Sequence, residues 1–222
     1  MTVLLFALVA LLVVPAILPL GRASQMMVEL LFTVTAVAAA LEIGTSKAFL
    51  VLGASVAAAA VVAHVATWIW PGSRAGLVAA QFLVVVLFSL LIWRVGQDVV
   101  HARVVTADVL RGAVAIYLLL GLSWSFLYRM TDTLDPHAFS MPAVTVSVDA
   151  PTAGRNLRRN ETFLYFSFVT LTTLGYGDVT PRSRPARTLA WLEAMVGQLY
   201  IAVTVAGLVA LRISHRRDEE DD

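Results

Sequence analysis

The segment Thr173-Leu174-Gly175-Tyr176-Gly177-Asp178 constrains the fold of this chain more than any other feature. Its two glycines alternate with residues that carry side chains, and glycine adopts positive φ angles at no steric cost. When the backbone alternates in hand, successive carbonyl groups turn toward one side of the loop. The side chains of Leu174 and Tyr176 then point toward the other side. The segment therefore predicts an extended loop with a row of main-chain oxygens along one face.

The composition of the chain places this loop in a membrane protein. Of the 222 residues, 59% are apolar, and the mean hydropathy is +0.82. Such values are typical of polytopic membrane proteins and lie outside the range of soluble domains. The net charge of +1 gives no indication of a nucleic-acid partner. Cysteine is absent, so disulfides and thiolate metal sites are excluded.

Six apolar segments are long enough to cross about 30 Å of hydrocarbon as helices. They run over Val3–Leu20, Met26–Leu41, Ala48–Trp70, Gly76–Trp93, Val109–Met130 and Thr188–Ile213. We therefore expect an all-α membrane protein in contact with the lipid bilayer. The first segment is apolar like a signal peptide, but no basic residue precedes it and the run is long. We interpret it as a membrane span.

Two connections between the spans are longer and more polar than the others. Residues 95–108 interleave charged side chains with valines, which is typical of an amphipathic helix in the membrane interface. The alternative is that they extend the fourth or fifth helix. Residues 131–159 form a long polar connection with several prolines, which we expect to be an external turret. Asn160 begins the next helix as its cap in our interpretation, although Asn160-Glu161-Thr162 also matches a glycosylation sequon.

The sequence from about Thr162 to about Val209 resembles the pore domain of tetrameric potassium channels, especially short prokaryotic ones. The likeness is carried by the string Thr170-Leu171-Thr172-Thr173-Leu174-Gly175-Tyr176-Gly177-Asp178, with Pro181 shortly after it. A lone Gly-Tyr-Gly would be weak evidence for this family, whereas the whole string between two apolar spans is strong evidence. The first half of the chain shares only the general plan of four spans before a pore.

The resemblance implies a re-entrant pore helix at residues 162–172, followed by a selectivity filter. The residues that bind the ion would be Thr173, Leu174, Gly175, Tyr176 and Gly177. Carbonyl oxygens from Thr173 to Tyr176 would replace the water around K⁺, the permeant ion, and no organic cofactor is expected. One loop cannot surround an ion, so the resemblance implies a homotetramer with cyclic symmetry.

Further residues are expected to support the filter. They are Tyr165, Phe166, Thr170, Thr172, Asp178 and Glu193. Phe166 has no hydrogen-bond donor, so a bond to Asp178 or Tyr176 has to come from another residue, such as Tyr165 or Thr172. An acid inside a membrane helix indicates a functional site by default. Glu193 is therefore expected to brace the pore helix through Ser167, Thr170 or Thr172.

The sixth span holds the candidates for a gate or hinge, which are Gly197, Thr204, Ala206 and Val209. Glycine weakens a helix by roughly 1 kcal/mol relative to alanine, so Gly197 is a candidate bend point. The alternative for Gly197 is close packing against the pore helix.

The chain divides into four parts by this interpretation. Residues 1–94 form a four-helix transmembrane domain, residues 95–108 a linker helix, residues 109–213 the pore domain, and residues 214–222 a charged cytoplasmic tail. The fourth span occupies the place of a voltage sensor but carries no charge before Arg94. Because steep voltage dependence requires several charges in the field, we expect weak or no voltage gating.

The leading hypothesis is a potassium-selective channel that conducts passively. Two alternatives stay open: a weakly selective cation channel, and a non-conducting membrane subunit that retains the pore fold. No set of polar residues resembles a nucleophile with its base or a metal centre, so we do not expect an enzyme. The resemblance implies a multi-pass protein of a prokaryotic plasma membrane with both termini in the cytoplasm.

Overall fold

A computed structural model of the chain describes residues 2–17, 35, 47–69, 73–102, 104–141 and 152–221. Its elements are α1 (Thr2–Ile17), α3 (Lys47–Ile69), α4 (Arg74–Val100), α5 (Ala107–Leu134), β1 (Phe139–Ser140), α6 (Thr152–Leu171), β2 (Thr180–Pro181) and α7 (Arg184–Asp221). The expected all-α character is confirmed. The expected span Met26–Leu41 lies outside the described residues except for Thr35.

Three of the described helices are long and apolar enough to cross a membrane. They are Arg74–Val100, Ala107–Leu134 and Arg184–Ile213. Two further apolar stretches, Thr2–Val14 and Val51–Thr67, are shorter within the described residues. The chain is therefore a helical membrane protein, and six spans remain a prediction.

Helices α4 and α5 form an antiparallel hairpin with a short connection. Helix α4 continues to Val100 and α5 begins at Ala107, where Thr106 caps it. Residues 95–100 thus extend the fourth helix, and the expected separate interfacial helix at residues 95–108 is wrong. The physical reason is that Val95 is buried in the core of the bundle, while Arg94 pairs with Asp98 one turn later on α4.

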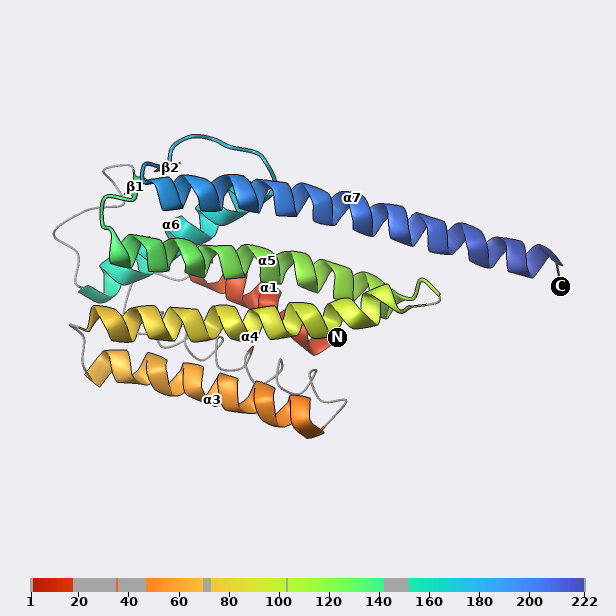
Figure 1. Cartoon of the computed structure of the whole chain (residues 1–222), viewed down its shortest axis with the longest axis horizontal. Coiled ribbons are helices and arrows are strands. Elements are labelled where there is room, and N and C mark those ends of the chain that lie inside the picture. Colours follow the sequence, from red (N-terminus) through yellow and green to blue (C-terminus); the bar gives the residue numbers. More distant parts are fainter. Residues whose placement is uncertain are drawn as a thin grey trace.

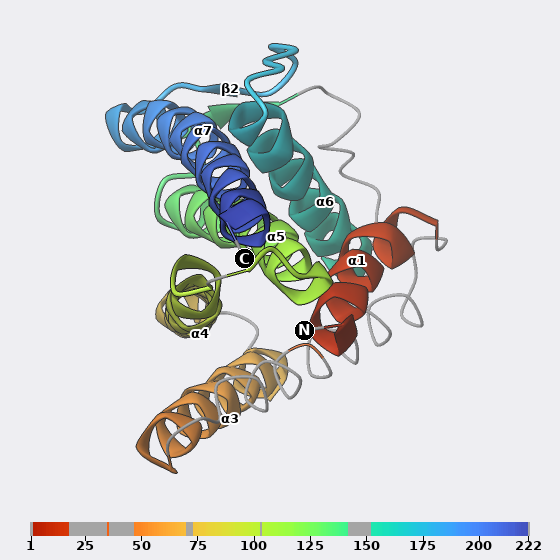
Figure 2. The same cartoon turned by 90° about the vertical axis from the view of Figure 1, so that its right-hand side faces the viewer.

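A hydrophobic core joins the N-terminal helices to the rest of the chain. Its buried members come from α1, α3, α4 and α5 and include Leu4, Leu8, Ala60, Phe88, Leu91, Ile116 and Leu119. Leu164 of α6 and Tyr200 of α7 pack against the same core. Figure 2 shows α5, α6 and α7 grouped together, with α3 at the edge beside α4. Because the α4–α5 connection is short, α4 packs against α5 of its own chain; α1 also packs against α5, and α3 packs against α4.

The expected polar connection at residues 131–159 is partly helical, because both flanking helices extend into it. Helix α5 runs to Leu134 and α6 already begins at Thr152, while residues 142–151 lie outside the described part. Asn160 lies inside α6, so the predicted cap at this residue is wrong. An ion pair between Arg159 of α6 and the buried Asp132 of α5 supports this earlier start of the helix.

A small sheet and an aromatic cluster close one end of the bundle. Strands β1 and β2 pair antiparallel, with Phe139 opposite Pro181. Phe139 also contacts Tyr128, Phe163 and Phe166 through edge-to-face ring contacts. These contacts tie the end of α5 to α6 and to the start of α7. Figure 1 shows α7 running from this end along the bundle and past it, and the helix continues through the expected tail to Asp221.

Candidate functional site

The Gly-Tyr-Gly loop, residues 172–178, follows the C-terminal end of α6. Its φ angles are positive at Thr173 (60°), Gly175 (57°) and Gly177 (80°). Among the described residues, Thr173 is the one non-glycine residue with a positive φ. Positive φ at every second residue is the alternation of backbone hand that the sequence predicts. An alternating backbone directs successive carbonyl groups toward one side.

The loop is fastened to the last turn of α6 by backbone hydrogen bonds. The Thr173 amide donates to the Thr170 carbonyl at 2.9 Å, and the Leu174 and Gly175 amides donate to the Val169 carbonyl at 2.9 and 3.3 Å. The last carbonyls of a helix have no partner within it, so these bonds satisfy α6 and position the loop together. The negative end of the α6 dipole therefore lies at the inner end of the loop, where it favours a cation.

The loop is uncovered in a single chain. The side chains of Leu174 and Tyr176 are 56% and 67% exposed. A Cβ atom added at Gly175 or Gly177 would meet nothing within 4 Å. The glycines are therefore required for their backbone angles and not for space.

The predicted supporting residues divide into two groups. Tyr165 lies beside the loop, where its ring stacks on Tyr176 with centroids 6.4 Å apart, and it interacts with the Asp178 carboxylate. Asp178 also accepts the Val179 amide at 3.0 Å. Phe166 lies elsewhere, because its ring packs against Tyr128 at 4.8 Å between centroids. Of Tyr165 and Thr172, the two residues that the sequence offers for a bond to Asp178 or Tyr176, Tyr165 is the one that interacts with Asp178.

The Thr172 hydroxyl does not contact Asp178 or Glu193 in the structure. It donates to the Phe168 carbonyl of its own helix at 2.7 Å. Thr170 contributes its carbonyl to the Thr173 amide. These two threonines therefore act on the end of α6 itself, at the point where the chain leaves the helix.

Glu193 lies in a buried polar network that joins three helices. The Ser167 hydroxyl of α6 is 2.5 Å from Glu193 Oε1, and the Tyr128 hydroxyl of α5 donates to Glu193 Oε2 at 2.5 Å. Ser167 also lies 2.7 Å from the Gly121 carbonyl. The side chains of Glu193, Ser167 and Tyr128 are fully buried. Ser167 is one of the three hydroxyls that the sequence proposes as partners of Glu193.

The loop, its helix and the following helix correspond to a known kind of domain. Residues 142–212 match a family model described as ion channel. This part of the chain is similar to ion channel domains. Neither a curated protein nor a solved structure matches the chain. Residues 1–141 and 213–222 lie outside the match, which supports passive ion conduction by the matched part.

Gly197 holds α7 close to the end of α6 within the matched segment. A Cβ atom there would lie 2.4 Å from the Leu171 carbonyl oxygen and 2.8 Å from Leu171 Cδ1. This contact agrees with the close-packing interpretation of Gly197, and α7 is a continuous helix through this position.

The other gate candidates lie farther along α7. Thr204 is half-buried, whereas Ala206 and Val209 are exposed. One turn before Thr204, the Tyr200 hydroxyl donates to the Ala113 carbonyl of α5 at 2.6 Å. Tyr200 therefore attaches α7 to α5, the helix against which α1 and α4 pack.

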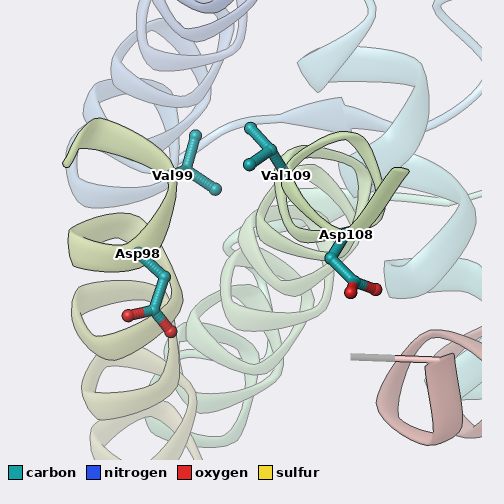
Figure 3. A pocket seen from close by; sticks show the side chains of 4 residues that line it. All are labelled: Asp98, Val99, Asp108 and Val109. Atoms are coloured by element: carbon teal, nitrogen blue, oxygen red, sulfur yellow. The ribbon is translucent and has the colours of Figure 1, made fainter. Parts of the chain in front are cut away.

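A hollow between the ends of α4 and α5 lies away from the loop. Figure 3 shows that Asp98, Val99, Asp108 and Val109 line it. Each carboxylate has an arginine of its own, because Asp98 pairs with Arg94 and Asp108 pairs with Arg111 at 2.8 Å. Their charges are compensated, so we assign no cation site to this hollow.

Sequence reasoning missed the residues of α5 that face α6 and α7. Gly121, Tyr128 and Asp132 each contact α6 or α7. Gly121 also touches the Phe168 ring so closely that a Cβ atom would lie 2.6 Å from it. With Ser125 these residues recur every three or four positions, which is the spacing of one helix face. That spacing is the signal that could have found them.

Proposed function

We propose that the chain forms a potassium-selective channel in which four copies surround one axis. The observation that carries this proposal is the alternation of φ at Thr173, Gly175 and Gly177. Four such loops would offer a dehydrated ion successive rings of main-chain oxygens. K⁺ is the permeant ion, and carbonyls from Thr173 to Tyr176 replace its hydration shell.

The single-chain surface supports a homotetramer. Large apolar side chains are exposed both on the loop and on the first half of α7, at Leu174, Tyr176, Trp191, Met195 and Leu199. Lipid can cover the outer face of α7, but irregular backbone at membrane depth needs protein or a water-filled cavity around it. Neighbouring copies supply that surrounding for the loop.

The proposed orientation places both termini in the cytoplasm of a prokaryotic cell, with six spans per chain. Figure 1 shows the C-terminus at the end of the molecule opposite to the β1–β2 sheet. Strand β2 directly follows the Gly-Tyr-Gly loop, so this sheet would mark the outer mouth. The N-terminal helices bring little gating charge. Arg94 pairs with Asp98, and no charged residue precedes it in α4 after Arg74. Voltage therefore acts weakly on this domain.

Purified protein in liposomes and planar bilayers tests this proposal. We expect K⁺ flux down its gradient, a reversal potential near that of K⁺ under K⁺/Na⁺ bi-ionic conditions, and little dependence of open probability on voltage. A reversal potential near zero would establish the weakly selective cation channel instead. Protein that is folded and tetrameric but carries no flux under any pH, voltage or lipid composition would establish the non-conducting subunit.

Glu193 acts as a support for the pore helix in this proposal. Replacing Glu193 with Leu leaves the buried Tyr128 hydroxyl without its acceptor, whereas the Ser167 hydroxyl keeps the Gly121 carbonyl. A buried polar group without a partner costs about 1–3 kcal/mol, so we expect a marked fall in the thermal unfolding temperature together with reduced K⁺ flux. Glu193→Gln is the matched control, because its amide oxygen still accepts the Tyr128 hydroxyl and should preserve most of the stability. Equal stability of wild type and Glu193→Leu would exclude the supporting role.

A further inference from the structure

Thr173 is an unusual residue at the start of the Gly-Tyr-Gly loop. Its φ of 60° lies in the left-handed region, which β-branched residues rarely occupy. Backbone strain of this kind persists only where the surroundings hold the residue in place. The contacts of the Thr173 side chain supply this support.

Two hydrogen bonds fix the Thr173 hydroxyl. It donates its only proton to the Thr172 carbonyl at 2.7 Å, and it accepts from Gln198 Nε2 of α7 at 3.3 Å. With its proton directed to Thr172, the hydroxyl oxygen keeps a second lone pair that no described hydrogen bond uses. That lone pair is available to a cation at the inner end of the loop.

The close approach of α7 to α6 places Gln198 beside the loop. Gly197 lies against the Leu171 carbonyl, where no side chain fits. The next residue along α7 is then within reach of Thr173, which lies two residues beyond Leu171. A glutamine in an apolar membrane helix is costly unless it has a polar partner, and such residues mark ion pathways.

We propose that Gln198 positions the Thr173 hydroxyl and thereby sets the affinity of the innermost cation site of the pore. This inference rests on the proposed function, because it assumes that Thr173 faces the permeant ion. Gln198 does not bind the ion itself in this proposal. It holds the rotamer of Thr173 in which the hydroxyl proton points away from the ion.

Block by Ba²⁺, a divalent cation close to K⁺ in size, tests the proposal. K⁺ currents through Gln198→Met are compared with wild type in planar bilayers, with Ba²⁺ added to each side in turn. Loss of the positioning bond should raise the half-blocking concentration on the α7 C-terminal side by about fivefold, as expected for one net hydrogen bond. Ile201→Met is the matched control, because Ile201 lies on the same helix and has no described contact with the loop, and its Ba²⁺ block should equal that of wild type.

A binding measurement keeps the test decisive if a variant carries no current. The Ba²⁺ concentration that half-maximally raises the thermal unfolding temperature of purified protein should shift in the same direction for Gln198→Met and for Gln198→Leu. In a Thr173→Val background, which lacks the hydroxyl, Gln198→Met should cause no further shift. Wild-type block or binding in the Gln198 variants overturns this inference alone. Absence of K⁺ flux and of Ba²⁺ binding in wild type overturns the proposed function instead.

Discussion

Replacing Gly175 with Ala should abolish K⁺ flux while leaving the protein folded. Gly175 has a φ of 57°, and left-handed backbone costs an L-residue roughly 1–2 kcal/mol. Four copies would bear this cost in the same ring of the pore. The backbone at residue 175 can relieve it by turning its carbonyl away from the axis, and the ring of oxygens is then lost. Flux into liposomes, with oligomeric state measured on the same sample, provides the test.

The effect of Gly175→Ala comes from the backbone angle alone. A Cβ atom at this position would meet nothing within 4 Å, so a steric clash within the chain is not the cause. Thr173 tolerates a similar φ because its hydroxyl makes two hydrogen bonds, which alanine cannot make. Gly96→Ala in α4 is the control, since a Cβ atom there would lie 4.0 Å from Ile116 Cδ1. K⁺ conduction by Gly175→Ala with wild-type selectivity would refute the assignment of the filter.

The geometry of the Gly-Tyr-Gly loop was predictable because it depends on local rules. Glycines at alternate positions permit positive φ, and the structure has positive φ at Gly175 and Gly177. The apolar runs of α4, α5 and α7 were equally readable from the sequence, since length and hydropathy decide whether a helix can cross a membrane. These features need no knowledge of what the segments contact.

Features that depend on tertiary contacts were predicted less well. The polar sequence before Asn160 has no apolar periodicity, yet α6 includes it, with Arg159 paired to the buried Asp132. The alternation of charged residues and valines in residues 95–100 resembled an interfacial helix, but Val95 packs into the core. In both cases contacts with another helix outweighed the local pattern.

Of the two side chains that bond Glu193, the sequence predicted one and missed the other. An acid in an apolar span requires polar partners, which narrowed the choice to three hydroxyls on the pore helix, and Ser167 is the one in contact. Tyr128 is 65 residues away from Glu193, and no local pattern connects the two. The packing of α5 against α7 brings them together, so only the structure identifies the second partner.

Replacing Gly197 with Ala should destabilise the protein and suppress K⁺ flux. The new Cβ atom would lie 2.4 Å from the Leu171 carbonyl oxygen and 3.2 Å from its carbonyl carbon. Backbone atoms cannot rotate away as a side chain can, so α7 or the end of α6 has to shift. Overpacking of this kind costs about 1–3 kcal/mol, which outweighs the gain of roughly 1 kcal/mol in helix propensity. Any shift of the α6 end also moves the loop that is hydrogen-bonded to Val169 and Thr170.

Gly207→Ala on the same helix separates packing from bending at Gly197. A Cβ atom at Gly207 would meet nothing within 4 Å, so this variant gains helix propensity and should keep or raise the unfolding temperature. If Gly197 serves only as a bend point, Gly197→Ala should behave like Gly207→Ala in thermal unfolding and differ from it only in open probability. If Gly197 is a packing contact, its unfolding temperature falls well below that of Gly207→Ala. The difference between the two unfolding temperatures therefore decides between the two interpretations of this glycine, whatever stimulus gates the proposed channel.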